Sequence, residues 1–378
     1  MNSIDLFYQN NKVNPNFDEN FYQKRYPETK EFYQPHCRIL NIDDKHRLYY
    51  HWFLYADKSD QQSIEYFYAT HTLIDDFDVD FYTRNYPDTK NFYQPYCRNQ
   101  NIDDKRRLYF HWHLSKSKRF KSPEDMQKHF FLFEKDHDVR IANSVCVIVH
   151  VYFFDVWQKE IAPEIKNLNL RFDLYISLTE GGGFENKKDE ILKDFPNATI
   201  VSVPNRGADV GPFFKILKTI SDTGCKYEYL LKLHTKKSVH LSEDWSLCFR
   251  LHFYKNLCRN LDYCIDLMNK NKSIAMIGPP NSMVELSNSE DEKNLMKFKE
   301  LVKRFELKDD SINFIAGTMF VCRFELLSKY FKDISIYEFE TGHKTDGTLA
   351  HSFERIFSNI VRSENQKIYC LGEKYDCN

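Results

Sequence analysis

The chain has 378 residues, with 53 basic and 55 acidic side chains and a formal net charge of −2. This length indicates two or three domains, since one domain usually takes roughly 100–200 residues. The near-neutral charge excludes a strongly basic nucleic-acid binder. A hydrophobic fraction of 42%, with 32 Phe and 24 Tyr, excludes a disordered chain.

No membrane-spanning helix is expected. The longest apolar run covers about residues 145–154, whereas a spanning helix needs roughly 20 residues. The N-terminal sequence MNSIDLFYQNNK lacks the basic start and apolar block of a signal peptide. The ten cysteines contain no CxxC spacing, and several fall inside apolar patterns, where free Cys acts as a small hydrophobe. We therefore predict a cytoplasmic protein that reaches a membrane only through partners.

An internal repeat dominates the first third of the chain. The segments that start at Phe17 and Phe77 are offset by 60 residues without a gap, and 25 of their 38 positions are identical. In each copy, Asp18 or Asp78 predicts the N-cap of a short helix. Tyr-Pro then predicts a turn, and IDDKxRLYxHW predicts a second helix.

Three interpretations of these aromatic repeats stay open. The first is a small helical module whose Phe, Tyr and Trp side chains form its core, because aromatic side chains bury the most area. The second is docking of carbohydrate or protein through exposed Tyr and Trp. The third is a zinc site that pools Cys37 and His51 with Cys97 and His111, although the spacing within one copy matches no standard finger.

The domain organisation follows from where these patterns stop. We predict helical repeat 1 at 1–60 and helical repeat 2 at 61–115. The basic, serine-containing stretch SKSKRFKSPEDMQKHF then predicts a linker at 116–143. From there on, apolar runs alternate with helical patterns, which predicts an α/β domain at 144–378.

Four apolar runs in this domain predict strands: residues 145–154, 172–178, 198–204 and 227–234. One long helix is expected from Trp245 to Met268, with Cys258 and Cys264 as packing residues. The strand-like IAMIGPP, a polar segment and FIAGTMFVCR follow, and TDGTLAHSFERIFSNIV predicts a closing helix. The alternation indicates a doubly wound, mostly parallel sheet flanked by helices.

Ligands of such sheets bind at the carboxyl ends of the strands, and polar residues follow all four predicted strands. They are His150 and Tyr152 after the first, Thr179 and Glu180 after the second, Asn205, Arg206, Gly207 and Asp209 after the third, and Lys232, His234, Thr235, Lys236 and Lys237 at the fourth.

Two of these strand ends carry features suited to an anion. The HTKKS loop puts three basic side chains, His234, Lys236 and Lys237, next to one strand end, and a cationic cluster there fits a diphosphate. By the two-residue period, Lys232 shares a strand face with His234. After the third strand, Arg206 and a new helix N-terminus add anion affinity, while Asp209 is suited to accept a ribose or sugar hydroxyl. An ordinary solvated basic turn and an ordinary strand-to-helix turn remain the alternatives.

Other nucleotide-binding and catalytic signatures are absent from the sequence. There is no GxxxxGK[ST], GxSxG or HExxH, and the glycines at 181–183 lack the GxGxxG spacing. Kinase, dehydrogenase, hydrolase and zinc-protease readings therefore lose their main support.

Seven blocks carry a resemblance to a known family. VHVYFFDVW, FDLYISLT, VPNRGADVGPF, YLLKLHTKKS, MIGPP, FIAGTMF and DGTLAHSFERIF occur in this order. They resemble the rhamnan synthesis protein F family over about residues 145–360. The N-terminal units are similar to the FDxxYYxxxYPDV modules that often accompany such transferases, but they lack the usual HYxxxGxxEGR ending.

The resemblance implies a GT-A-like, Rossmann-type sheet and a glycosyltransferase. Such an enzyme would move a sugar, with rhamnose as a candidate, from a nucleotide-sugar donor (UDP- or dTDP-sugar) to a glycan or glycoconjugate acceptor in surface polysaccharide synthesis. His150, Thr179, Asn205, Arg206 and Asp209 would line the nucleotide pocket. FIAGTMF would form the floor on the acceptor side.

The resemblance also suggests which residues neutralise the donor diphosphate and which residue deprotonates the acceptor hydroxyl. Lys232 and His234 fall where GT-A enzymes carry an Asp-x-Asp metal motif, so we expect Lys232, His234 and Lys236 to neutralise the diphosphate, with a divalent metal dispensable. Asp346 is the candidate base for the acceptor hydroxyl and Glu354 is the second choice. A helix N-cap is the competing reading of Asp346.

Two other function classes stay open beside the enzyme. One is a non-catalytic sugar- or nucleotide-binding protein on a transferase fold. The other is a scaffold whose N-terminal repeats dock further polysaccharide-assembly enzymes. No nucleic-acid partner is expected.

Overall fold

The computed structural model describes residues 3–55, 64–115, 119–134, 144–181, 183–237, 242–285, 292–342 and 347–373. The chain forms two compact units, one mainly up to Lys128 and the other mainly from His129 onward. Across the described residues, no helix is both long and apolar enough to span a bilayer.

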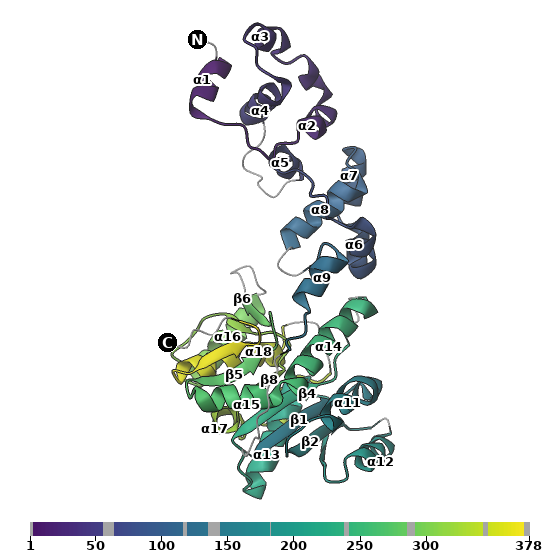
Figure 1. Ribbon diagram of the computed structural model, residues 1–378, viewed down its shortest axis with the longest axis vertical. Helices are drawn as coiled ribbons and strands as arrows, with labels where there is room; N and C mark the ends of the chain where they lie inside the picture. The colour runs from purple at the N-terminus through teal and green to yellow at the C-terminus, as the bar shows by residue number, and fades with distance from the viewer. Residues whose placement is uncertain are drawn as a thin grey trace. The chain divides into compact units, whose positions relative to one another are not determined.

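The first unit is all-helical and repeats itself (Figure 1). Repeat 1 contains α1 (Ser3–Asn10), α2 (Glu19–Arg25), the 3-10 helix η1 (Pro27–Lys30), α3 (Gln34–Ile39) and α4 (Asp44–Tyr55). Repeat 2 contains α5 (Ile64–Thr70), α6 (Val79–Asn85), η2 (Pro87–Asn91), α7 (Gln94–Asn99) and α8 (Asp104–Ser115).

The helix starts predicted in the repeats are confirmed. Asp18 and Asp78 cap α2 and α6, and each carboxylate accepts the N–H of the residue three positions on at 2.8 Å. The sequence did not predict α3 and α7, which begin after Tyr33 and Tyr93. Both tyrosines have a positive φ, near 52° and 51°, an unusual state for a bulky side chain.

The aromatic side chains of the repeats mostly form small cores, as the first of the three interpretations holds. Phe17, Tyr22, Leu48 and Trp52 pack together in repeat 1. His51 and His111 each hydrogen-bond a tyrosine hydroxyl, Tyr22 at 3.0 Å and its counterpart in repeat 2 at 2.8 Å. The Nδ1 atom of each of the two histidine rings therefore already has a hydrogen-bond partner.

Within the range expected to be a linker, residues 119–134 are described and contain α9 (Pro123–His129). The chain beyond α9 packs along the second unit. There Asn256 Oδ1 accepts from the Phe133 N–H at 2.7 Å, and Asn260 Nδ2 donates to the Phe133 carbonyl at 3.1 Å.

The second unit is built on a seven-stranded sheet in the order β3-β2-β1-β4-β8-β5-β9. Its strands are β1 (Val145–Val151), β2 (Asp173–Thr179), β3 (Thr199–Val203), β4 (Tyr229–His234), β5 (Ile274–Gly278), β8 (Phe320–Arg323) and β9 (Lys367–Cys370). Among the described strands of this sheet, β8 runs antiparallel to both of its neighbours and the other neighbouring pairs are parallel. The short strands β6 (Met283–Glu285) and β7 (Asn313–Ile315) form a separate antiparallel pair.

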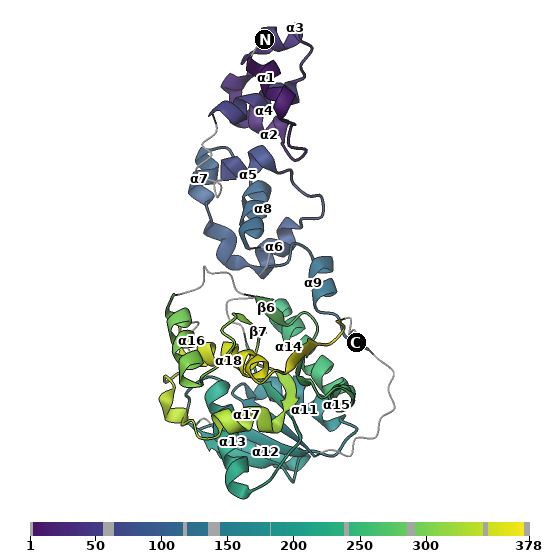
Figure 2. The same cartoon turned by 90° about the vertical axis from the view of Figure 1, so that its left-hand side faces the viewer.

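Helices cover both faces of this sheet (Figures 1 and 2). They are α10 (Phe154–Val156), the π-helix η3 (Trp157–Ile161), α11 (Ala162–Lys166), α12 (Phe184–Asp194), α13 (Val210–Thr223), α14 (Glu243–Arg259), α15 (Leu261–Lys270), α16 (Glu292–Arg304), α17 (Phe324–Phe331), the 3-10 helix η4 (Ile336–Glu338) and α18 (Leu349–Ser363). The predicted mostly parallel sheet flanked by helices, with an all-α N-terminal region, is confirmed.

Alternate side chains of each strand feed two separate cores. Val147 and Val149 of β1 face one core with α14 and α15, whereas Cys146 and Ile148 face the other with α13, α17 and α18. Because both faces are covered, β1 is buried at every position, which explains why its residues are apolar except for His150.

The long helix predicted from Trp245 to Met268 is wrong in one respect: it is two helices. α14 ends at Arg259 and α15 begins at Leu261. Asn260 interrupts them, because its side-chain amide donates to the carbonyls of Phe133 and Asn256 at 3.1 and 2.9 Å. Both cysteines are buried in the apolar core, as predicted.

Candidate active site

A row of polar side chains crosses the carboxyl ends of three neighbouring strands. In the sheet register, His150 of β1 lies beside Ser177 of β2 and His234 of β4. Because their side chains share one face, the Nδ1 atom of His150 reaches the Ser177 hydroxyl at 3.0 Å. All three residues are buried, so this row is a polar inset at the end of an apolar sheet face.

A buried ion pair lies directly beside this row. Lys232 precedes His234 by two residues on β4, and its Nζ donates to Asp209 Oδ2 at 2.5 Å and to the Thr318 carbonyl at 2.8 Å. The Thr318 hydroxyl donates to the same Asp209 oxygen at 2.5 Å. The Lys232 side chain is 1% exposed and that of Asp209 15% exposed, so water screens this pair only weakly.

The pKa values of this cluster follow from burial and pairing. Burial alone would raise the pKa of Asp209, but His234, Lys232 and the hydrogen bonds from Lys232 and Thr318 hold it well below its usual range. Burial lowers the pKa of Lys232, and the charge of Asp209 opposes this shift. At neutral pH the carboxylate is therefore ionised, and the ammonium beside it balances its charge.

The two histidines of the cluster are neutral at pH 7. Burial lowers the pKa of His150 to about 4 and the pKa of His234 to about 3, with Asp209 opposing both shifts. The Nδ1 atom of His234 lies 3.5 Å from Asp209 Oδ2. Among the described residues, it has no hydrogen-bond partner. This ring nitrogen is thus a buried polar atom left available beside Asp209.

The loop after β3 is tied to a later loop of the chain. Arg206 donates from Nη1 to the Phe339 carbonyl at 2.8 Å and forms a backbone bridge with Thr341. Gly342 N–H donates to the Asn205 carbonyl at 2.9 Å. The predicted nucleotide-binding residues Asn205 and Arg206 therefore share one site edge with residues 339–342.

Gly207 permits this close approach. Its φ is +71°, and a Cβ at this position would come within 2.6 Å of the Phe339 ring. Any larger residue would have to push that ring away and would adopt a disfavoured backbone state. The glycine in Asn-Arg-Gly is therefore required by the contact between the two loops as well as by the turn.

Glu354 holds the turn that carries Thr318. It lies on α18, and its Oε1 accepts the Gly317 N–H at 2.7 Å. Gly317 and Thr318 both have positive φ values, 85° and 52°. The FIAGTMF block therefore ends β7, makes a tight turn and begins β8. Glu354 fixes this turn, which places the Thr318 hydroxyl against Asp209.

The remaining basic residues of the HTKKS loop have different surroundings. Lys236 is half-buried, with its Nζ 5.0 Å from the centre of the Phe249 ring. Lys237 pairs with Asp155 at 2.6 Å. Thr235 accepts the backbone N–H groups of Tyr152 and Phe153, both at 2.9 Å, and so fixes the loop to the end of β1.

Asp346 lies outside the described residues, but the chain on either side of it is anchored. Gly342 is bound to Asn205, as above. On the other side, Lys297 Nζ donates to the Gly347 carbonyl at 2.9 Å and to Glu340 Oε1 at 2.6 Å. Glu340 also accepts the Leu349 N–H at the start of α18, so its carboxylate caps this helix.

A divalent cation finds no evident set of ligands in the part of the chain that the structure describes. No group of three or more His, Cys, Asp or Glu side chains there is arranged to hold a metal ion. Lys232, which the resemblance aligns with the Asp-x-Asp motif of GT-A enzymes, is a buried cation in an ion pair with Asp209.

The structure thus brings Asp209, Lys232 and His234 into one cluster, with His150 beside them. Thr179 lies two positions beyond Ser177 on β2 and shares its face. Asn205 and Arg206 lie on the adjoining loop, and Lys236 packs against an aromatic ring. Sequence reasoning missed Ser177 and Thr318. Ser177 could have been predicted, because it lies two residues before Thr179 and therefore on the same strand face. No sequence signal near Thr318 indicates its role.

An α/β protein with a buried polar cluster at the carboxyl edge of a mostly parallel sheet belongs to the class that binds ligands at that edge. The chain belongs to the rhamnan synthesis protein F family, whose model matches residues 97–366, more than half of its length. The match begins inside repeat 2, upstream of the blocks that carry the resemblance. No curated protein matches the sequence significantly.

Several solved structures are similar to the chain at low identity. TarS 1–349 of S. aureus in complex with UDP-GlcNAc is 13% identical over 61% of this chain and 56% of that chain, with a TM-score of 0.35. The mannosyltransferase PcManGT from Pyrobaculum calidifontis, in complex with GDP-Man and Mn²⁺, is 9% identical over 70% and 61%, with a TM-score of 0.36. The chain thus spans about three fifths of the length of these proteins.

Proposed function

We propose that the chain is a nucleotide-sugar-dependent glycosyltransferase that acts in polysaccharide assembly, with rhamnose as the candidate sugar and a glycan or glycoconjugate as acceptor. The observation that carries the proposal is the buried cluster of Asp209, Lys232, His234 and Thr318 at the carboxyl edge of the sheet, in a chain of this family. A UDP- or dTDP-sugar is the donor class, and the reaction is placed in the cytoplasm.

The cluster supports binding of a polar, uncharged part of the donor. Asp209 Oδ2 already accepts from Lys232 and Thr318, which leaves Oδ1 suited to accept a ribose or sugar hydroxyl. The free Nδ1 atom of His234 is a second polar contact. Because the ammonium of Lys232 is balanced by Asp209, in this proposal it orients Asp209 and does not itself neutralise the diphosphate.

In this proposal, the diphosphate of the donor binds instead to cations at the rim of the candidate active site. Arg206 donates to a backbone carbonyl and Lys236 lies over an aromatic ring. No carboxylate among the described residues pairs with either side chain. Positive charge of this kind stabilises a leaving nucleoside diphosphate as the bond to the sugar breaks. In transfer, the acceptor hydroxyl loses its proton to a base, attacks the anomeric carbon and displaces the nucleoside diphosphate.

Calorimetric titration tests the donor class. We expect the purified protein to bind one of UDP, dTDP, GDP and CMP in the presence of EDTA, with Arg206→Gln and Lys236→Gln each weakening binding about tenfold. Lys237→Gln, which removes the neighbouring cation paired with Asp155, is the matched control. Binding only with Mn²⁺ would contradict metal-free charge neutralisation, and no binding in either condition would favour the scaffold reading.

A turnover assay tests the base. We expect Asp346→Asn to lower transfer about a hundredfold or more, because it removes a general base while keeping the shape of the side chain. Glu354→Gln keeps an oxygen that accepts from Gly317, so we expect a much smaller effect. The reverse order of effects would assign the base to Glu354, and equal rates for both variants and the wild type would remove both residues from catalysis.

A further inference from the structure

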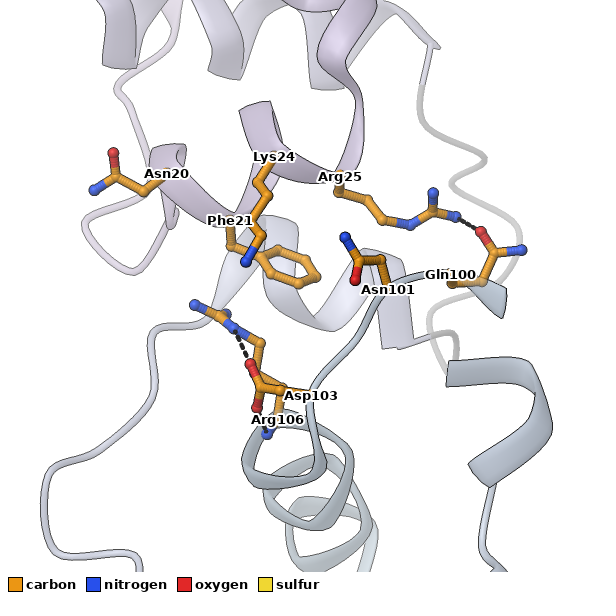
Figure 3. Close-up of a pocket in the computed structure, with 8 residues that line it drawn as sticks. All are labelled: Asn20, Phe21, Lys24, Arg25, Gln100, Asn101, Asp103 and Arg106. Atoms are coloured by element: carbon orange, nitrogen blue, oxygen red, sulfur yellow. Dashed lines mark hydrogen bonds and ion pairs between the residues drawn. The ribbon is translucent and has the colours of Figure 1, made fainter. Parts of the chain in front are cut away.

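A cleft lies between the two helical repeats, outside the candidate active site (Figure 3). Its volume is about 170 Å³, more than ten times the ~10–15 Å³ that one water requires. Its lining side chains are Asn20, Phe21, Lys24 and Arg25 from α2 of repeat 1, and Gln100, Asn101, Asp103 and Arg106 from repeat 2. Three lining residues are cations and one is an acid.

The three cations of the cleft differ in how many of their nitrogen atoms already have a hydrogen-bond or ion-pair partner. Arg106 is partly satisfied, because its Nη2 donates to Asp18 at 2.9 Å and its Nε lies 3.6 Å from Asp103. Its Nη1 is buried and, among the described residues, has no hydrogen-bond partner. Arg25 donates to the neutral side chain of Gln100. Lys24 is exposed and makes no ion pair within the described parts of the chain.

The geometry directs these groups toward one space. Figure 3 shows the side chains of Lys24, Asn101 and Arg106 pointing into the gap between α2 and the start of α8. The guanidinium of Arg106 is held in place by stacking over Phe21, 4.3 Å from the ring centre. An ammonium, a rigid guanidinium and neutral amides around one opening match the oxygens of a phosphate group.

Most of the polar residues that line the cleft are specific to the place where the two repeats meet and do not recur in the other copy of the repeat. At the positions that correspond to Arg25 and Arg106, the other copy has Asn85 and His46, and the position of Gln100 has Leu40. The two copies are identical at 25 of 38 aligned positions, so the repeat fold does not require Arg25 or Arg106, whereas Lys24 has a cation, Arg84, at the corresponding position. Asp18 accounts for one nitrogen of Arg106, but no contact within the junction accounts for Lys24 or the Nη1 of Arg106.

We propose that the cleft between the repeats binds a phosphate group, free or carried by a sugar. Lys24 supplies an exposed positive charge and Arg106 a fixed one, while Asn20, Asn101 and Gln100 offer amide groups. Asp103 also lines the cleft, but its carboxylate accepts the backbone N–H of Arg106 and lies 3.6 Å from the Nε of Arg106, so its charge is already paired. This site is independent of the proposed transferase reaction.

Titration of the full-length protein with inorganic phosphate, glucose 1-phosphate and glucose, at constant ionic strength, tests the proposal. We expect both phosphates to bind and glucose not to bind. We expect Lys24→Gln to weaken phosphate binding about tenfold, because it removes one charged contact. Arg84→Gln is the matched control, since Arg84 holds the same position in repeat 2 but does not line the cleft.

Each outcome decides the question. Tighter binding of glucose 1-phosphate than of inorganic phosphate would assign a sugar phosphate, and equal binding would assign the phosphate group alone. Equal weakening by Lys24→Gln and Arg84→Gln would show non-specific attraction and overturn the proposal, as would the absence of phosphate binding. A phosphate signal unchanged in Lys24→Gln would place binding elsewhere, for instance at the sheet edge, and also overturn it.

Discussion

Lys232→Met is expected to lower the free energy of unfolding of the α/β unit by about 3–5 kcal/mol. The substitution keeps the length of the side chain but removes the ammonium that donates to Asp209 and to the Thr318 carbonyl. The Asp209 carboxylate then stays buried with only the Thr318 hydroxyl as a strong donor. An uncompensated buried charge, rather than a lost contact, is the source of the effect.

Hydrogen exchange of the β1 amides, corrected for intrinsic rates, measures this loss within the α/β unit alone. Lys237→Met is the matched control, because its ion pair with Asp155 is partly exposed and is worth less than about 1 kcal/mol. The double variant Lys232→Met, Asp209→Asn carries no buried charge and should recover most of the loss. A double variant as unstable as the single one would show that packing, not charge, dominates.

Much of the fold was predictable because its signals are local. The runs that became β1 to β4 are mostly apolar in sequence, and each matched a strand to within a few residues. β1 and β4, which are buried at every position, require such runs because both faces of the sheet are covered there. The caps at Asp18 and Asp78 were likewise readable, since a cap depends on residues three positions apart.

The parts that sequence could not supply depend on distant partners. Asn260 ends α14 because of Phe133, which lies 127 residues away, and an asparagine inside a helical pattern does not reveal such a contact. Thr318 lies 109 residues from Asp209, and its importance arises only when β8 inserts antiparallel beside β4. The expected role of Lys232 changed for the same reason: the sequence shows a basic loop, whereas the fold supplies the carboxylate that balances it.

Acid should destabilise the α/β unit well before its carboxylates titrate. His150, His234 and His252 are buried, and burial lowers their pKa values to about 4, 3 and 4 respectively. In the unfolded chain a histidine has a pKa of about 6.5. Between these values the unfolded state binds a proton that the folded state does not. Stability is therefore fully present above about pH 6.5 and falls as the pH drops toward the folded pKa values.

At pH 5.0 we expect each of these histidines to remove about 2 kcal/mol of stability relative to pH 7.5, and the three together about 6 kcal/mol. This is comparable to the whole stability of many domains. Asp209 does not add to the loss in this range, because its lowered pKa contributes stability that is lost only below about pH 3.9. The change in the free energy of unfolding between pH 6.5 and pH 5 therefore measures the protonation of the three histidines.

His252 allows one of these contributions to be isolated, since it lies outside the polar cluster and its Nε2 contacts the Pro280 carbonyl at 2.8 Å. We expect His252→Gln to reduce the slope of stability against pH by about one proton, whatever the substitution costs at pH 7.5. His46→Gln, at a side chain that is 43% exposed in the other unit, should leave the slope of the α/β unit unchanged. Hydrogen exchange of the β1 amides at several pH values measures both variants. An unchanged slope in His252→Gln would mean that this ring is already protonated in the fold or reaches water, and the argument from burial would then fail for His150 and His234 as well.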